Sequence, residues 1–199
     1  PEFLLKSKEG GDQCFLFNLA DPKACDYLCK YVGDIVEKEK VDCLCLDCCI
    51  APEYFWRGND PYGRVGISEI KYVTGLYRFW DYLSNRFPNL RLTTRLEGGS
   101  RIDLEALSRT SVLNRSACRE PLAQQCHHYG LSLFVPMHGT KTFVTEPYEA
   151  RSAYSPLVTT HYEMLTNKSV GSTAMRAIQD ELKGIRHYFM TDYYPLSGF

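Results

Sequence analysis

One carboxylate interrupts an apolar run early in the sequence. Residues 41–50 (VDCLCLDCCI) read as a short buried strand with Asp47 near its C-terminal end, and Pro52 then breaks the strand into a polar, aromatic loop that holds Trp56 and Arg57. A charge in an apolar strand is costly unless it is paired or used. Two hypotheses follow. Asp47 is a catalytic carboxylate, or it is a structural carboxylate paired with an arginine.

Four cysteines surround this carboxylate, at positions 43, 45, 48 and 49. Thiolates at such spacing could bind a soft metal, but strand alternation places Cys43 and Cys48 on faces that cannot both meet a single ion with Cys45 and Cys49 unless the strand breaks. Small buried hydrophobic residues are the better interpretation. Cys49 with the His127-His128 pair gives no zinc spacing either, so we expect no metal and no cofactor. We expect that pair to lie on a helix, with one ring inward and one outward. A nucleophilic site of Cys118 with His127 or His128 rests on composition alone.

The bulk composition is that of a globular protein. The chain has 199 residues, 44% of them hydrophobic, and a formal net charge of -1. This charge gives no long-range field for nucleic acid or an anionic membrane, and no apolar run approaches the ~20 residues of a membrane span. Nine cysteines without a visible secretory signal predict free, buried thiols in a reducing compartment, the cytoplasm. The start at Pro1 indicates a trimmed chain.

Strand and helix patterns alternate along the chain. The expected strands are 15–19, 41–49, 90–94, 111–115, 131–136 and one within 153–160. The expected helices are 22–40, 66–87, 101–109, 120–129 (ended by Gly130) and one that starts at Ser172. This order predicts parallel β/α units, in either a doubly wound sheet or part of a (β/α)₈ barrel. In both folds chemistry lies at the C-terminal ends of strands, where Asp47, residues 97–99, Arg115-Ser116 and His138-Gly139 fall.

Several segments, in order and over nearly the whole chain, carry a family pattern. They are Trp56-Arg57, 64–70 (RVGISEI), 75–77 (GLY), 98–105 (GGSRIDLE), Arg115-Ser116, Gln125, 129–132 (YGLS), 138–140 (HGT) and 192–196 (DYYPL). On these segments the chain resembles the melibiase-type α-galactosidases of glycoside hydrolase family 36. The resemblance implies retaining hydrolysis of terminal α-galactosides by a (β/α)₈ barrel.

The resemblance assigns the two catalytic positions. Asp47 stands where the family has its nucleophile, and Ala117 stands where the family has its acid/base aspartate. A retaining mechanism needs two carboxyl groups about 5–5.5 Å apart, and this sequence supplies only the first. Glu97 ends the neighbouring strand where the family has serine. It is a candidate surrogate acid, or it forms an ion pair with Arg101 or Arg95.

The resemblance also implies a sugar-binding set. Trp56 and Arg57 would stack on and hydrogen-bond a sugar at the pocket rim, or anchor a packed loop. Gly98 and Gly99 would let the backbone approach the sugar, while Arg115 would contact sugar or carboxylate, or form a salt bridge at the barrel mouth. Cys45 and Cys49 replace two polar family positions on the same strand face as the nucleophile.

These observations define one partial domain, residues 1–199, of (β/α)₈ TIM-barrel type with about the last six β/α units. Six strands cannot close an eight-stranded barrel, so we expect the open edge to be covered by a second copy in a homo-oligomer or by missing barrel segments. The predicted function is that of a retaining α-galactosidase with activity impaired by Ala117. The alternative is a non-catalytic, degenerate or partial barrel with weak carbohydrate binding or a structural role. The expected partner is a galactoside or other carbohydrate, with no nucleic acid and no membrane.

Overall fold

The computed structural model describes residues 2–6, 15–46, 50–94, 102–116, 118–135, 137–142, 145–160 and 172–196. The chain forms two compact units. Unit 1 comprises Pro1–Thr93 with Asp103–Thr110, and unit 2 comprises Thr94–Ile102 with Ser111–Phe199. Each unit is considered separately below.

Unit 1 combines a small antiparallel hairpin with helices and the first two strands of the main sheet. Its elements are β1 (Leu4–Lys6), β2 (Phe15–Phe17), α1 (Pro22–Glu39), β3 (Cys43–Leu46), α2 (Glu53–Asn59), α3 (Ile67–Arg86), β4 (Arg91–Thr94) and α4 (Leu104–Arg109). The hairpin consists of β1 and β2. The backbone N–H of Arg91 donates to the carbonyl of Asp42 at 3.0 Å, which joins the segments that begin β4 and β3.

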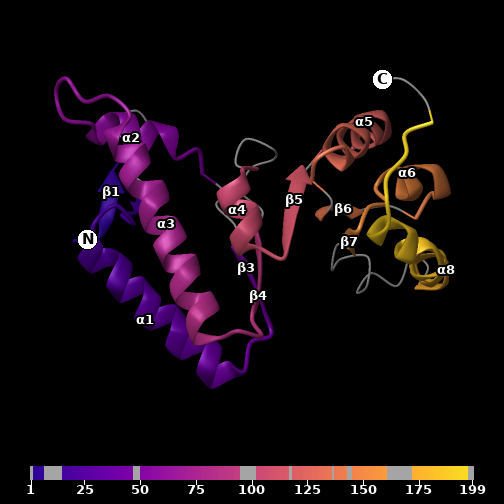
Figure 1. Cartoon of the computed structure of the whole chain (residues 1–199), viewed down its shortest axis with the longest axis horizontal. Helices are drawn as coiled ribbons and strands as arrows, with labels where there is room; N and C mark the ends of the chain where they lie inside the picture. The colour runs from indigo at the N-terminus through magenta and orange to yellow at the C-terminus, as the bar shows by residue number, and fades with distance from the viewer. Residues whose placement is uncertain are drawn as a thin grey trace. The chain divides into compact units, whose positions relative to one another are not determined.

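Helix α1 begins and ends as its sequence predicts. The Asp21 carboxylate accepts a hydrogen bond from the backbone N–H of Lys23 at 2.8 Å, and Pro22 is the first helical residue. The helix ends at Glu39, and the next residue, Lys40, caps it with a left-handed φ of 52°. Helices α1 and α3 lie side by side (Figure 1) and are linked by ion pairs of 2.5 Å, Arg78–Asp26 and Arg86–Glu37.

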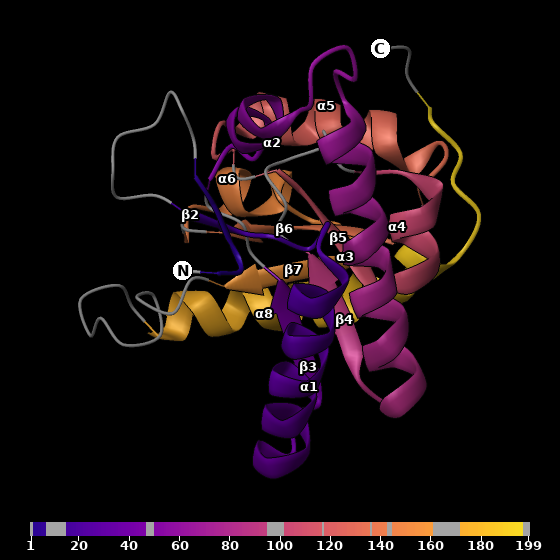
Figure 2. The same ribbon diagram turned by 90° about the vertical axis from the view of Figure 1, so that its left-hand side faces the viewer.

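Unit 2 continues the β/α alternation. Its elements are β5 (Val112–Ser116), α5 (Pro121–Ser132), β6 (His138–Thr142), α6 (Pro147–Ser152), β7 (Leu157–Thr160), α8 (Ser172–Ile185) and the 3₁₀ helix η2 (Arg186–Met190). Strand β6 pairs in parallel with both β5 and β7. Figures 1 and 2 show α5, α6 and α8 around β6 and β7. Ala150, Tyr154 and Ile178 form the centre of the α6–α8 core.

The main sheet has five strands in the order β3-β4-β5-β6-β7, which is their order along the chain. A parallel sheet with this sequential order and intervening helices confirms the prediction of an incomplete (β/α)₈-type barrel. The expected strand at 15–19 is not part of this sheet. Among the described residues it forms β2, which pairs with β1 instead.

Three local predictions were wrong: the loop after Pro52, the helix end at Gly130 and the strand that follows it. Residues 53–59 form helix α2 instead of a loop. The strand predicted at 131–136 is not formed by its described part, residues 131–135, because α5 continues through Gly130 to Ser132 and the strand lies further on, at β6. Leu133 and Phe134, which suggested a strand core, are exposed. Apolar character alone does not tell a helix end from a buried strand.

The cysteine thiols were predicted to be buried. Among the six described cysteines, this prediction holds for Cys25 and Cys29 only. Cys25 and Cys29 in α1 are buried, Cys118 and Cys126 are intermediate, and Cys43 and Cys45 in β3 are exposed. All six are free thiols. Burial raises the pKa of the Cys29 thiol to about 12, so this thiol stays protonated and unreactive at neutral pH.

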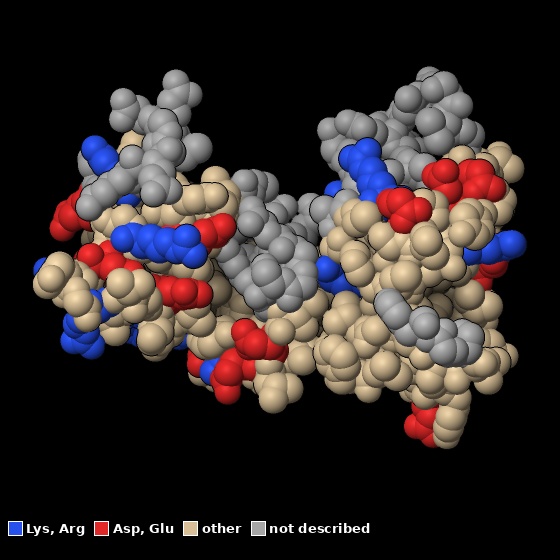
Figure 3. Space-filling model, turned by 90° about the horizontal axis from the view of Figure 1, so that it is seen from above, with Lys and Arg blue, Asp and Glu red and all other residues tan. Residues whose placement is uncertain are grey.

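Charge is mixed on one face of the molecule. On the face drawn in Figure 3, Lys and Arg side chains alternate in small groups with Asp and Glu. None of the helices in the described ranges combines the length and apolar character that crossing a bilayer requires.

Candidate functional site

Several predicted site residues lie outside the described residues. These are Asp47, Glu97, Gly98, Gly99 and the replaced acid/base position, Ala117, as well as Cys48 and Cys49. The described chain reaches Leu46 at the end of β3, Thr94 at the end of β4 and Ser116 at the end of β5. The catalytic assignments therefore remain predictions, while the residues that hold these strand ends can be described.

Trp56 and Arg57 lie on α2 in unit 1. The Trp56 side chain is 7% exposed and packs in a core with Leu16, Phe55 and Tyr72. Its ring lies 5.3 Å from that of Tyr72, at 52° between the planes. The neighbouring Arg57 side chain is exposed. Trp56 thus anchors α2 within unit 1, and Arg57 is the member of this pair that is open to solvent.

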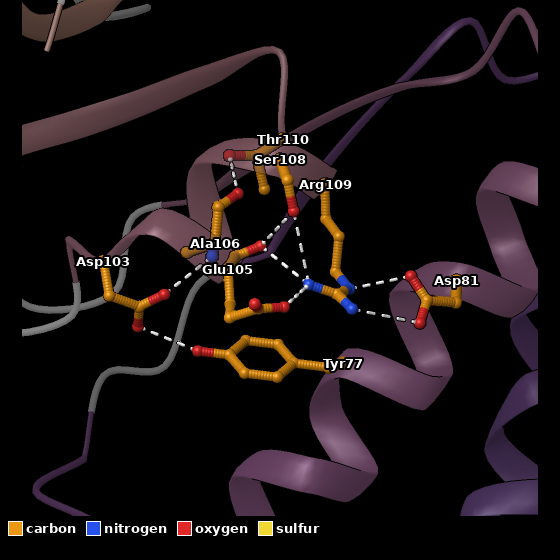
Figure 4. A network of polar contacts seen from close by, with 8 residues as sticks. All are labelled: Tyr77, Asp81, Asp103, Glu105, Ala106, Ser108, Arg109 and Thr110. Carbon is orange, nitrogen blue, oxygen red and sulfur yellow. Dashed lines mark hydrogen bonds and ion pairs between the residues drawn. The ribbon is translucent and has the colours of Figure 1, made fainter.

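A polar network anchors the chain after the 98–101 segment. In unit 1, Asp103 Oδ1 accepts a hydrogen bond from the backbone N–H of Ala106 at 2.7 Å and so caps α4, while its Oδ2 accepts from the Tyr77 hydroxyl at 2.8 Å (Figure 4). Arg109, at the other end of α4, pairs with Asp81 at 2.7 Å and with Glu105 at 2.6 Å. Its guanidinium carbon lies 4.8 Å from the centre of the Tyr77 ring. These contacts fix α4 on α3.

Arg115 is a buried cation in unit 2. Its side chain is 2% exposed and reaches from β5 to α5 and β6. Nη2 donates to Oε1 of Gln124 at 2.9 Å, and Nη1 lies 3.2 Å from Nδ1 of His138. Among the described residues both partners are neutral groups and Nε has no partner, so the predicted alternative of a salt bridge is not seen. Burial lowers the pKa of Arg115 to about 10, which still leaves it charged at neutral pH.

Gln124 connects this arginine to the residues on either side of position 117. Its Nε2 donates to the carbonyl oxygen of Cys118 and, at 3.2 Å, to Oγ1 of Thr140. Thr140 in turn donates to the carbonyl oxygen of Ser116 at 3.2 Å. One buried amide therefore holds the backbone at both sides of the position where the family pattern has its acid/base residue.

The imidazoles of His128, on α5, and His138, on β6, extend this network. Nε2 of His138 lies 3.1 Å from Oγ of Ser132, and Nδ1 of His128 lies 3.5 Å from the same oxygen. The rings of His128 and His138 lie 5.2 Å apart. Burial, together with the positive charge of Arg115, lowers the pKa of His128 to about 4 and that of His138 to about 3. Both rings are therefore neutral at neutral pH. His127 is exposed, so the prediction of one inward and one outward ring is confirmed.

Gln124 and the role of His138 in this network were not predicted from the sequence. The family pattern includes its neighbour Gln125, which is exposed and donates to Tyr148 at 3.1 Å and Ser152 at 2.9 Å. The sequence does contain a signal for this network. Gln124, His128 and Ser132 recur every four residues and so share one face of α5. A helix face of polar groups beside a strand arginine indicates a buried network. Within the described ranges, no group of three or more His, Cys, Asp or Glu could hold a metal ion.

Comparisons with known proteins agree with this architecture. A family model described as Melibiase matches residues 5–173. An α-galactosidase from Escherichia coli is 29% identical over 140 residues, which are 68% of this chain and 19% of that protein. The crystal structure of an α-galactosidase from Lactobacillus brevis superposes with a TM-score of 0.72 at 15% identity, covering 95% of this chain and 28% of that one. The structure of a Geobacillus stearothermophilus family 36 α-galactosidase in complex with raffinose superposes with a TM-score of 0.68 at 15% identity, covering 94% of this chain and 28% of that one.

Proposed function

The chain belongs to the melibiase family, and we propose that it corresponds to the catalytic barrel of a retaining α-galactosidase-like glycoside hydrolase acting on terminal α-galactosyl groups. The observation that carries this proposal is the family match over residues 5–173. We propose Asp47, the residue that follows Leu46 at the end of β3, as the nucleophile. The chain spans 19% of its Escherichia coli relative and about a quarter of the solved structures, so the activity of those whole proteins is a proposal here.

In the proposed mechanism the Asp47 carboxylate attacks the anomeric carbon, and the leaving group departs with the electrons of the glycosidic bond. The family's proton donor is absent, because position 117 is alanine. Loss of a general acid typically lowers the rate by ~10²–10⁴, and by more for a poor leaving group. We therefore propose an impaired enzyme, with Arg57, Gly98 and Gly99 as sugar contacts. Trp56 and Arg115, whose side chains are buried, would support the pocket without lining it.

We also propose Glu97, at a position where the family has serine, as a surrogate acid; the alternative is an ion pair with Arg101 or Arg95. As the acid, Glu97 would donate the proton that Ala117 cannot. If so, Glu97→Gln lowers hydrolysis of an unactivated α-galactoside, and an unchanged rate removes this role.

A trapping assay tests the nucleophile directly. α-Galactosyl fluoride has a leaving group that departs as fluoride and needs little protonation, so attack by Asp47 should form a covalent galactosyl ester that mass spectrometry detects on the intact chain. The adduct should be absent in Asp47→Ala and retained in Asp42→Ala, a matched control five residues upstream. Absence of any adduct in the unmodified chain would contradict catalysis.

The second candidate is a non-catalytic barrel that binds carbohydrate weakly or serves as structure. Ala117 is the observation in its favour, together with Cys45 and Cys49 at two polar family positions. This candidate predicts no adduct with the fluoride substrate and no hydrolysis even after long incubation.

A further inference from the structure

Unit 2 contains a cavity at the C-terminal end of α5. Its volume is about 230 Å³. This is below the 300–1,000 Å³ of typical ligand pockets, so it suits a small molecule of one ring. One side comes from α5 and the other from the chain after α8. The lining residues used below are His128, Ser132, Tyr188, Phe189, Asp192 and Tyr193.

Hydrogen bonds of fixed direction lead from Arg115 to this cavity. An arginine can only donate, so Nδ1 of His138 is an acceptor and its proton is on Nε2, from which it donates to Oγ of Ser132. The Ser132 hydroxyl is then free to donate to Nδ1 of His128. His128 consequently carries its proton on Nε2, an atom that bonds to none of the described residues. Because His128 lines the cavity, its Nε2–H is the donor that this ring can offer to a ligand there.

The opposite wall supplies acceptors and flat apolar surfaces. Among the described lining residues, Asp192 is the one charged side chain, and within the described chain its Oδ2 accepts a hydrogen bond from the Tyr194 hydroxyl at 3.3 Å while its Oδ1 has no partner. The rings of Phe189 and Tyr193 stand nearly perpendicular to that of His128, at 88° and 83°, with centroid distances of 5.8 and 6.3 Å. Tyr188 is 66% exposed.

These groups select one class of ligand. A neutral donor on one wall and a carboxylate acceptor on the other match a molecule whose hydroxyls both donate and accept. Aromatic faces match the C–H face of a sugar ring. An anion would meet the Asp192 carboxylate, and a cation would meet the His128 N–H with the charge of Arg115 behind it.

The cavity is separate from the strand ends that the family uses for catalysis. Within unit 2, Ser116 ends β5 and precedes position 117, while Ser132 ends α5 and precedes the start of β6. A helix in a β/α unit runs opposite to its strands, so the two ends of α5 lie at opposite edges of the sheet. We propose that this cavity is a second carbohydrate site, which binds a single neutral hexose ring and is independent of the proposed catalytic pocket.

Titration calorimetry with D-galactose and D-glucose, and with acetate as an anionic probe, tests the site on the full 199-residue chain. We expect one sugar to bind. Asp192→Asn, which removes a charge-assisted hydrogen bond, and Tyr193→Ala, which removes an aromatic face, should each weaken that binding at least about tenfold. Asp180→Asn and Tyr62→Ala change exposed residues that do not line the cavity, so they should leave the affinity within about twofold.

Two further measurements keep the proposal open to refutation. Asp47→Ala should abolish the covalent adduct of the fluoride substrate but leave sugar binding unchanged, which separates this site from the catalytic one. Side-chain nitrogen NMR should show the Nε2-protonated tautomer of His128 and a shift of its signal with sugar, while exposed His187 stays unmoved. Binding of acetate alone, no sugar binding, or a loss of binding in Asp47→Ala would each overturn the proposal.

Discussion

Arg115 and Gln124 share a 2.9 Å hydrogen bond between two buried side chains, one on β5 and one on α5. Because Gln124 also reaches the Cys118 carbonyl and the Thr140 hydroxyl, this pair joins a strand, a helix and the chain around position 117.

Replacing Gln124 with leucine, a residue of similar size, should destabilise the protein by roughly 3 kcal/mol. The change leaves one buried charged donor and one buried carbonyl unpaired, and each such group costs about 1–3 kcal/mol. Urea unfolding measures the loss. The matched control is Gln125→Leu, on the exposed face of the same helix, for which we expect less than ~1 kcal/mol. Equal losses for the two variants would show that the buried network contributes little.

Acid should destabilise the protein through His128 and His138. Their folded-state pKa values of about 4 and about 3 lie below the ~6.5 of an unfolded histidine. The unfolded state therefore binds more protons below that pH, and stability that is complete above pH ~6.5 falls as pH drops toward 4. The slope should be on the order of 2 kcal/mol per pH unit near pH 5.

The comparison of two histidine variants tests this slope. His128→Gln should remove about half of the pH dependence of the unfolding free energy, whereas His187→Gln, which changes an exposed histidine, should leave it intact. Parallel pH profiles for the original chain and His128→Gln would contradict the assignment.

Gly75 should not tolerate a side chain. A Cβ built there would lie 1.9 Å from the carbonyl oxygen of Leu19, a backbone atom, so α3 or the segment before α1 must move. We expect Gly75→Ala to cost roughly 1–3 kcal/mol, as measured by thermal unfolding. Gly130 in α5 has open space around its Cβ position, and Gly130→Ala should be neutral or stabilising by up to ~1 kcal/mol. The prediction fails if both variants respond alike.

Asp103 should stabilise α4 through its cap and through Tyr77. Asp103→Ala removes both hydrogen bonds, with an expected loss of roughly 1–2 kcal/mol, while Asp103→Asn keeps an oxygen for the cap and should lose less. Burial and the bond to Asp103 also raise the pKa of Tyr77 to about 12. Ultraviolet titration should show this pKa fall in Asp103→Ala. Its persistence would mean that Asp103 is not the partner in solution.

Ala117→Asp should restore the proton donor of the proposed mechanism. Hydrolysis of an aryl α-galactoside with a poor leaving group should rise by ~10² or more, the typical contribution of a general acid, and the gain should vanish in the double variant with Asp47→Ala. Ala117→Asn, which has a similar shape and no acid, is the control. A rise of the same size in the asparagine variant would exclude proton donation as its cause.

The sequence predicted most of the β/α order, because caps, prolines and apolar spacing are local signals. Asp21-Pro22 marked the start of α1, and the apolar spacing from Ser172 to Ile185 marked α8. It misplaced β6, because Leu131–Val135 is apolar enough for a strand although α5 continues to Ser132 and a turn follows. Only the packing of α5 against β5 and β6 decides between the two.

Family membership and the barrel-type fold could be recognised from the motifs that carry the resemblance. The places of Asp47 and Ala117 in the catalytic pattern stay predictions. The burial of Arg115 without a carboxylate among the described residues, its bond to Gln124 and the cavity beside His128 could not be recognised from the sequence. Those features join residues from two strands, one helix and the chain after α8. Their contacts arise from side-chain packing between elements distant in sequence, which no local pattern encodes.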